Sequence, residues 1–399
     1  EAVAHGGGLP FLALALMRGE SIDPLLKRAK AVLGESPWGV GILGFVPEQL
    51  RNEQLGVIER YKPPFCIIAG GRPSQAKTLE ANGTKAYLHV PSTGLLDLFL
   101  KDGAKRFIFE GRECGGHVGP RTSLLLWETQ IQRLLEFGDN SGIEAIFAGG
   151  IHDSFSAAFV GIMSAELCSR GAKVGVLMGT AYLFTKDAVE TGAILPRYQQ
   201  EALKARDTVL LETAPGHSTR CLPTPYVDAF NRVRADLEAN GLDAKEIWSE
   251  LEQLNVGRLR MASKGLARLS KDGPIESIDD AQQAADGMYM IGQVAALRDR
   301  VITIRQLHEN VASGIEHIRT AAMQTQPSLS DDDDPRIALI GMACVYPGAP
   351  NKDAFWDNIV QGRNSVTEVP KERWDVDIYY DPDSMGGEKT PCKWGGFLG

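Results

Sequence analysis

The segment from Glu110 to His117 has the clearest capacity for chemistry, with the sequence Glu-Gly-Arg-Glu-Cys-Gly-Gly-His. It directly follows an apolar run, 106–109, that is typical of a buried β-strand. Gly115 and Gly116 carry no side chain, so a flat cofactor can approach their backbone closely. The imidazole of His117 titrates near neutral pH and is suited to proton transfer beside that cofactor. The alternative interpretation of His117 is a loop histidine bonded to the backbone.

A second group suited to ligand binding follows two later apolar runs. Its members are Gly149, Gly150, Met178, Gly179 and Thr180. Loops of this kind present backbone N–H groups, and a barrel commonly binds phosphate after its last two strands. The order of strand, Gly-Gly, helix, strand and Met-Gly-Thr therefore predicts a phosphorylated cofactor. Taken singly, each glycine has the alternative of a tight-turn residue.

Other titratable residues carry weaker signals. His152 could touch the phosphate, but solvent exposure is the simpler interpretation. Glu110 and Glu113 could form a carboxylate pair, yet side chains three positions apart beside a turn need not point together, so they stay outside the catalytic set. The run Asp331–Asp334 reads as a solvated connector, because metal ligands must converge from a rigid frame. No metal site is predicted.

These residues must be positioned by a series of short apolar runs. The runs span 9–15, 38–45, 65–69, 86–90, 106–109, 143–148 and 174–178. They lack polar alternation and are separated by helix-length gaps, a pattern that indicates parallel strands with crossover helices. A closed (β/α)8 barrel needs eight strands. Because residues 1–5 read as the end of a helix, we expect the first strand upstream and the chain to be part of a longer polypeptide.

The predicted domains follow from changes in pattern along the 399 residues. Residues 1–225 are expected to form the cofactor-binding barrel without its first strand, and 226–325 a helical extension. Residues 326–334 are polar and acidic and are expected to be a linker. Residues 335–399 then begin a separate unit.

Composition narrows the function classes. The net charge is −9 and the hydrophobic content 43%. There is no basic stripe for nucleic acid and no apolar run long enough to cross a bilayer. The six cysteines lack metal-like pairing or disulfide density, which favours a reducing cytoplasm. We therefore expect a cytoplasmic protein with neither nucleic acid nor membrane as a partner.

Five segments of the chain resemble the nitronate monooxygenase family and its relatives, the flavin-dependent enoyl-acyl carrier protein reductases. They are Gly6–Leu9, Glu113–Gly119, Ala148–Asp153, Met178–Thr185 and Met290–Val294. Such proteins are FMN-binding TIM barrels. The resemblance implies an FMN site and a catalytic imidazole, His117. The implied FMN contacts are Gly115, Gly116, Gly149, Gly150, Met178, Gly179, Thr180 and Gln293. Cys114 and Gly41 depart from the family pattern, so contacts to the flavin ring are expected to differ there.

Residues 335–399 are similar to the amino-terminal start of a β-ketoacyl synthase, a thiolase-like domain of modular polyketide or polyunsaturated fatty-acid synthases. The resemblance rests on Ile337–Cys344, Tyr346–Ala349, Phe355-Trp356, Val369-Pro370, Arg373-Trp374, Tyr379–Pro382 and Gly395–Leu398. The region that would supply the nucleophilic cysteine is not included, so condensing activity is not expected on this chain. The resemblance also implies other domains of the same synthase as partners and a homodimeric parent.

Together these features favour an enoyl reductase section of a multifunctional synthase. NADPH would be the reductant and an acyl thioester on an acyl carrier protein the substrate, with FMN mediating hydride transfer. One alternative is oxidation of a nitroalkane or nitronate with dioxygen. Another is a structural or docking segment without turnover, because an opened barrel would leave unpaired strand edges and an incomplete flavin face.

Overall fold

The structure is a computed structural model that describes residues 1–268, 273–314, 316, 319–320 and 341–398. The chain divides into two compact units, Glu1–Gln326 and Pro327–Gly399. The predicted linker 326–334 and the start of the synthase-like segment, up to residue 340, lie outside the described residues. Each unit is described by itself below.

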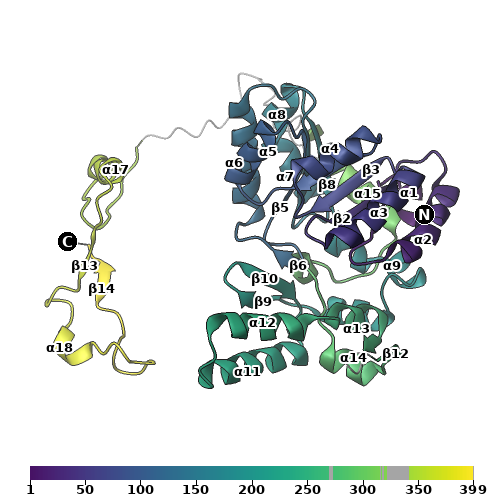
Figure 1. The fold of residues 1–399 in the computed structure, drawn as a ribbon. Helices are drawn as coiled ribbons and strands as arrows, with labels where there is room; N and C mark the ends of the chain where they lie inside the picture. The colour runs from purple at the N-terminus through teal and green to yellow at the C-terminus, as the bar shows by residue number, and fades with distance from the viewer. Residues whose placement is uncertain (269–272, 315, 317–318, 321–340, 399) are drawn as a thin grey trace. The chain divides into compact units, whose positions relative to one another are not determined.

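Seven parallel strands form the main sheet of the first unit, in the order β1-β2-β3-β4-β5-β7-β8 (Figure 1). They are β1 (Phe11–Ala13), β2 (Gly39–Leu43), β3 (Phe65–Ala69), β4 (Lys85–His89), β5 (Arg106–Glu110), β7 (Glu144–Ala148) and β8 (Lys173–Leu177). Each lies within or overlaps one of the seven apolar runs. The sheet curls into a TIM-like half-barrel, with β1 and β8 at its two edges, and this confirms the predicted fold class.

The strands read as continuous apolar runs because both faces of the sheet are covered. In β5, Phe107 and Phe109 belong to the large core between the sheet and the helices. Ile108, between them, belongs instead to a small inner cluster with Tyr87 and Ala148. Successive side chains of a strand point to opposite faces, so one strand supplies both layers.

Helices connect the strands along the outside of the sheet. They are α2 (Gly19–Leu33), α3 (Glu48–Tyr61), α4 (Pro73–Ala81), α5 (Thr93–Lys101), α6 (Ser123–Phe137), α7 (Ser154–Met163) and α8 (Ala165–Ser169). The apolar stretch after Asp153, expected as one helix, is two, with the break at Ser164. The Ser164 hydroxyl donates 2.6 Å back to the carbonyl of Val160, a bond that bends helices.

A small antiparallel sheet lies beside the half-barrel (Figure 1). It contains β6 (Gly116–Val118), β10 (His217–Cys221) and β9 (Val209–Ala214), in the order β6-β10-β9. None of these strands was expected from the sequence. These strands matter because they position the candidate site: β6 carries Gly116 and His117, and His117 pairs with Thr219 of β10.

The expected helical extension contains more breaks than the apolar periodicity suggested. Its elements are α11 (Pro225–Ala239), α12 (Ala244–Asn255), α13 (Arg258–Lys264), the hairpin β11 (Leu266–Arg268) and β12 (Ile275–Ser277), α14 (Asp280–Asp286), η2 (Gln293–Leu297) and α15 (Ile304–Ala312). Helices α11 and α12 are separate, because Gly241 between them has a φ of 71°. Such a left-handed backbone ends a helix.

Helix α15 returns to the amino-terminal end of the chain. The Nδ1 atom of its His308 lies 2.9 Å from the carbonyl oxygen of Gly6, and the Nε2 atom lies 2.8 Å from the Tyr182 hydroxyl. Tyr182 belongs to η1 (Thr180–Phe184), the short helix that follows β8. One imidazole of α15 therefore joins this helix to the chain start and to the loop after β8.

The second unit contains α17 (Lys352–Val360), the paired strands β13 (Val366–Glu368) and β14 (Trp394–Gly396), and α18 (Val376–Tyr379). Its buried hydrophobic residues are Ala349 and Val369, and large side chains such as Trp356 and Trp394 are exposed. In the described parts of both units, no helix is long and apolar enough to cross a membrane.

Candidate active site

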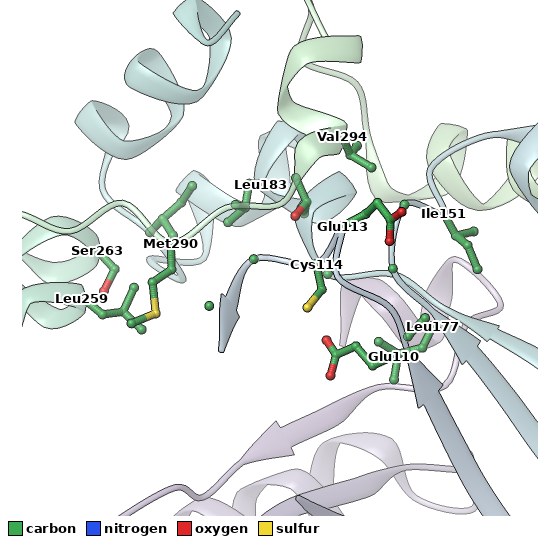
Figure 2. A pocket seen from close by; sticks show the side chains of 18 of the residues that line it. Glu110, Glu113, Cys114, Ile151, Leu177, Leu183, Leu259, Ser263, Met290 and Val294 are labelled. Carbon is green, nitrogen blue, oxygen red and sulfur yellow. The ribbon is translucent and has the colours of Figure 1, made fainter. Parts of the chain in front are cut away.

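A cavity of about 450 Å3 opens at the carboxyl ends of the central strands (Figure 2). Glu110 ends β5, Ala148 ends β7 and Leu177 ends β8, and all three residues line it. Figure 2 shows Glu110 and Cys114 on one side, with Met290, Leu259 and Ser263 on the opposite side. Ligands bind at this end of parallel strands because the variable loops converge there.

Most of the predicted cofactor contacts line this cavity. They are Gly115, Gly116, Gly149, Gly150, Gly179 and Thr180. Gly149 and Gly150 have φ values of 106° and 84°, a conformation that residues with a Cβ rarely adopt. A Cβ on Gly149 would lie 2.6 Å from the Ser123 hydroxyl. A Cβ on Gly179 would meet nothing within 4 Å, so the backbone there faces open space.

Three predicted residues lie outside that lining. Met178 packs against hydrophobic cores, and Gln293 lines a neighbouring cavity instead. The side chain of His117 is exposed on β6 and is not among the residues that line either cavity. Gly115 and Gly116, which precede His117 in sequence, do line the first cavity. The catalytic role of His117 stays a prediction.

The segment after Met290 closes one side of the cavity through main-chain contacts. The N–H of Gly292 donates 2.8 Å to the Thr180 hydroxyl, and the N–H of Gln293 donates 2.9 Å to the Glu113 carbonyl. A Cβ on Gly115 would lie 2.6 Å from the carbonyl carbon of Ile291. The close approach of two backbones explains why Gly115 and Gly292 have no side chains here.

The two glutamates at the cavity have different partners. The Oε2 atom of Glu113 accepts from the N–H of Ser123 at 2.8 Å and from its hydroxyl at 2.6 Å, at the start of α6. A carboxylate is stabilised at a helix amino terminus. Glu110 lies instead beside His89, with Nδ1 and Oε2 at 3.4 Å. Burial lowers the pKa of His89, against the opposing effect of the Glu110 carboxylate.

Cys114 lies in the cavity wall and directly follows Glu113 in sequence. Burial, and then the neighbouring Glu110 carboxylate, raise the pKa of its thiol strongly. The Sγ atom lies 3.7 Å from the His117 carbonyl oxygen. A thiol in this environment stays protonated at neutral pH and acts as a small packed side chain.

The far wall of the cavity was anticipated from the sequence only at Leu183 and Met290, which lie in two of the segments that carry the family resemblance. It is formed by Leu183, Ala193, Ile194, Tyr198, Leu259, Ser263 and Met290. Tyr198 donates its hydroxyl to the Met290 carbonyl at 2.5 Å, which fixes the closing segment against α10 (Pro196–Lys204). The other five residues of this wall belong to no segment of the resemblance, and only the folded chain brings all seven together.

The cavity fits a flavin mononucleotide. Its volume lies within the roughly 300–1,000 Å3 of small-molecule sites. Left-handed glycines at 149 and 150 and the open backbone at Gly179 suit a phosphate, while apolar side chains such as Ile194 and Leu259 suit a flat ring. In the described part of the chain, no group of three or more His, Cys, Asp or Glu residues could hold a metal ion.

Comparisons with known proteins assign this half-barrel to the class of flavin-dependent oxidoreductases. The family model of nitronate monooxygenase matches residues 9–314, more than half of the chain. The chain therefore belongs to the nitronate monooxygenase family, whose members are flavin enzymes. The matched range includes the extension with α11–α15 as well as the half-barrel.

Similar proteins include reductases and dehydrogenases. A Mycobacterium tuberculosis protein, (3aS,4S,5R,7aS)-5-hydroxy-7a-methyl-1-oxo-octahydro-1H-indene-4-carboxyl-CoA dehydrogenase, is 27% identical, with 81% of this chain and 90% of that protein covered. FabK from Thermotoga maritima has a TM-score of 0.62 at 24% identity, covering 81% and 89% of the two chains. The enoyl reductase domain of MlnA from the macrolactin cluster of Bacillus amyloliquefaciens has a TM-score of 0.53 at 12% identity, covering 82% and 98%. These two structures show a shared fold.

The second unit has a different affiliation. Residues 334–399 match the model of the β-ketoacyl synthase amino-terminal domain. The polyketide synthase PksL of Bacillus subtilis is 45% identical over 75 residues, 19% of this chain. The match spans only 2% of PksL, so the chain corresponds to a small part of that relative. The predicted resemblance to the start of a synthase domain is confirmed.

Proposed function

We propose that the first unit is the enoyl reductase of a polyketide or polyunsaturated fatty-acid synthase. The observation that carries this proposal is the fusion of a nitronate monooxygenase-type half-barrel to the start of a β-ketoacyl synthase on one chain. Synthases of this kind produce enoyl thioesters, and a flavin oxidoreductase on the same chain has such a substrate at hand. The 27% identical relative is itself named for a coenzyme A thioester.

The proposed reaction adds two hydrogens across a carbon–carbon double bond. A hydride from NADPH ends on the β-carbon of the enoyl thioester and a proton on the α-carbon, giving a saturated thioester and NADP+. When bound, FMN supplies the relay for the hydride. The protein contributes binding, orientation and the proton, for which His117 is the proposed donor.

The described residues suit these roles. Backbone N–H groups at Gly149, Gly150 and Gly179 would hold the phosphate of FMN, and the Thr180 hydroxyl can donate to it while accepting from Gly292. The apolar wall with Leu183 and Ile194 would exclude water from the ring and the thioester. Gly116 lines the cavity and directly precedes His117, and the proposal requires the thioester to extend from the cavity to this exposed imidazole.

The test uses the full chain, purified and mixed with FMN. Flavin fluorescence should be quenched on binding, and anaerobic addition of NADPH and crotonyl thioester should yield butyryl thioester, detected by mass spectrometry. A protein that does not bind added FMN would support the alternative of a structural or docking segment without turnover. Binding of FMN without reduction of the thioester would refute the proposed substrate class.

Nitronate oxidation is the second candidate, favoured by the description of the family model itself. It differs from enoyl reduction in needing dioxygen and no nicotinamide. Oxygen uptake with propyl nitronate in the absence of NADPH, together with inertness toward crotonyl thioester, would support it over enoyl reduction.

A further inference from the structure

A second cavity, of about 420 Å3, adjoins the first on the other side of the loop after β5. It is lined by Arg112, Glu113, Thr122, Thr208, Leu210, Arg220 and Gln293. Glu113 lines both cavities, so the two share one wall. Unlike the first, this cavity has only one apolar side chain in its lining, and two of its residues are arginines.

The guanidinium of Arg220 is buried in the wall of this cavity. The residue is 5% exposed, on β10. It donates to the carbonyl oxygen of Arg112 through Nε at 3.1 Å and Nη2 at 3.0 Å, and to the Thr208 hydroxyl through Nη1 at 2.9 Å. A guanidinium has five N–H donors, and these contacts use three.

Arg220 has no ion-pair partner among the residues that the structure describes, where a pair is defined by 4.0 Å between nitrogen and oxygen. Glu113 and Asp207 are acidic and near, but the Glu113 carboxylate is bonded at the start of α6. A buried cation without a carboxylate is costly unless an anion satisfies it. Arg112 adds a second cation, whose one described side-chain bond is a 3.4 Å contact to the Pro120 carbonyl.

The remaining lining residues complete a set of donors. Thr122 and Gln293 are exposed and bring a hydroxyl and an amide to the same space. Two guanidinium groups with neighbouring hydroxyl and amide donors form the chemistry that recognises phosphate, since arginine forks match phosphate oxygens. The first cavity has its own phosphate-binding loops at Gly149 and Gly179, so this second set is free for another group.

We propose that the Arg112–Arg220 cavity binds a phosphate carried by a reaction partner, while the flavin occupies the first cavity. This inference rests on the proposed function for the identity of the partner. Two sources share the chemistry: the 4′-phosphopantetheine of the acyl thioester and the 2′-phosphate of NADPH. In either case the cavity would hold the partner beside the flavin and select it over a version without phosphate.

The test compares affinities of the full chain, loaded with FMN, by calorimetric titration without turnover. One pair of ligands is crotonyl-phosphopantetheine and crotonyl-pantetheine, and the other is NADP+ and NAD+, which carry the same phosphate difference as NADPH and NADH but cannot reduce the flavin. The unaltered protein should bind the phosphorylated member of one pair about tenfold or more tightly, as expected for one charge-assisted contact. The pair that responds identifies the source. Equal affinities within both pairs would overturn the proposal.

Arg112→Gln should remove that preference, and Arg121→Gln is the matched control. Arg121 is exposed, lies outside both linings and contacts Thr129. The Arg112 variant should keep its FMN content, and loss of FMN would overturn the inference by assigning the cavity to the flavin phosphate. A phosphate-dependent affinity without thioester reduction would retain the inference and refute only the proposed reaction.

Discussion

Thr180 and Gly292 meet across the mouth of the half-barrel, although 112 residues separate them in sequence. The Gly292 N–H donates to the Thr180 hydroxyl at 2.8 Å, and a Cβ on Gly292 would lie 2.8 Å from the same oxygen. The loop after β8 and the closing segment before η2 are thus held at hydrogen-bond distance by one side chain. Because Thr180 lines the first cavity, the wall of that cavity depends on both segments.

Replacing Thr180 with valine should weaken both stability and flavin binding. The Gly292 N–H would lose its acceptor while staying buried, which costs about 1–3 kcal/mol. Thermal unfolding and FMN titration measure the two effects. Thr180→Ser keeps the hydroxyl and should behave like the wild type, and identical melting and FMN affinity for the valine and serine variants would argue against the contact.

Gly149→Ala should be more damaging than an ordinary glycine replacement. The φ of 106° strains any residue with a Cβ, and that Cβ would stand 2.6 Å from the Ser123 hydroxyl and 3.0 Å from the Gly111 nitrogen. We expect a loss of roughly 2–5 kcal/mol in unfolding free energy. FMN affinity should fall as well, because the loop must move.

Gly138→Ala is the matched control for that loss. Gly138 has a φ of 96° but nothing within 4 Å of its virtual Cβ, so it carries the backbone strain alone. Denaturant unfolding should give the Gly138 variant a clearly higher unfolding free energy than the Gly149 variant. The reverse ranking would mean that the Gly149 loop is not tightly packed.

His117→Ala should lower the rate of enoyl reduction by about 10²–10⁴-fold while leaving flavin absorbance unchanged. The reason is that the imidazole is exposed beside the cavity and makes no core contact whose loss would disturb FMN. Turnover and flavin content should be measured on the same preparation.

His217→Ala serves as the control for His117. His217 is also exposed on the small antiparallel sheet, where its Nδ1 lies 3.7 Å from Glu252, and it lines neither cavity. The His217→Ala substitution should leave the rate of enoyl reduction unchanged. Equal rates for both variants and the wild type would remove His117 from the mechanism.

Asp153→Asn should reduce stability in a pH-dependent way. Asp153 caps α7, accepting from the Ser156 N–H at 2.9 Å and its hydroxyl at 2.7 Å. Burial raises the pKa of Asp153, but these bonds, with the charges of His152 and Arg298, outweigh it and lower the pKa below 3.8. The stabilisation by the charge is therefore complete above that value and is lost as the pH falls through the lower, folded-state pKa.

Urea unfolding at a series of pH values measures this dependence. The difference in unfolding free energy between the wild type and Asp153→Asn should be constant near neutral pH. It should close only in acid, below pH 3.8. Asp153→Ala, which also loses the cap acceptor, should cost about 1 kcal/mol more at every pH. A gap that widens on acidification would contradict the assigned direction.

The parallel strands could be predicted from the sequence because burial on both faces leaves an unbroken apolar run. The runs at 65–69 and 106–109 coincide with β3 and β5 within one residue. The antiparallel strands left no such signal. In β10, the buried faces include Thr219 and Arg220, polar side chains whose burial depends on partners from other elements.

The glycines of the candidate site could be predicted because their requirement is local: a left-handed φ or a close backbone approach. The far wall could not, since Tyr198, Leu259 and Met290 meet only after the extension has packed against the half-barrel. The cavity of Arg112 and Arg220 was missed for the same reason, as the two residues are 108 positions apart. The placement of the His117 side chain likewise depends on β6 pairing with β10.

The imidazole of His308, which binds Gly6 on one side and Tyr182 on the other, sets the practical size of an exchangeable module. An engineer who moves this unit into another chain must transplant everything from the first turn to α15 as one piece. A cut after the small antiparallel sheet would remove His308 and with it the contacts to Gly6 and Tyr182.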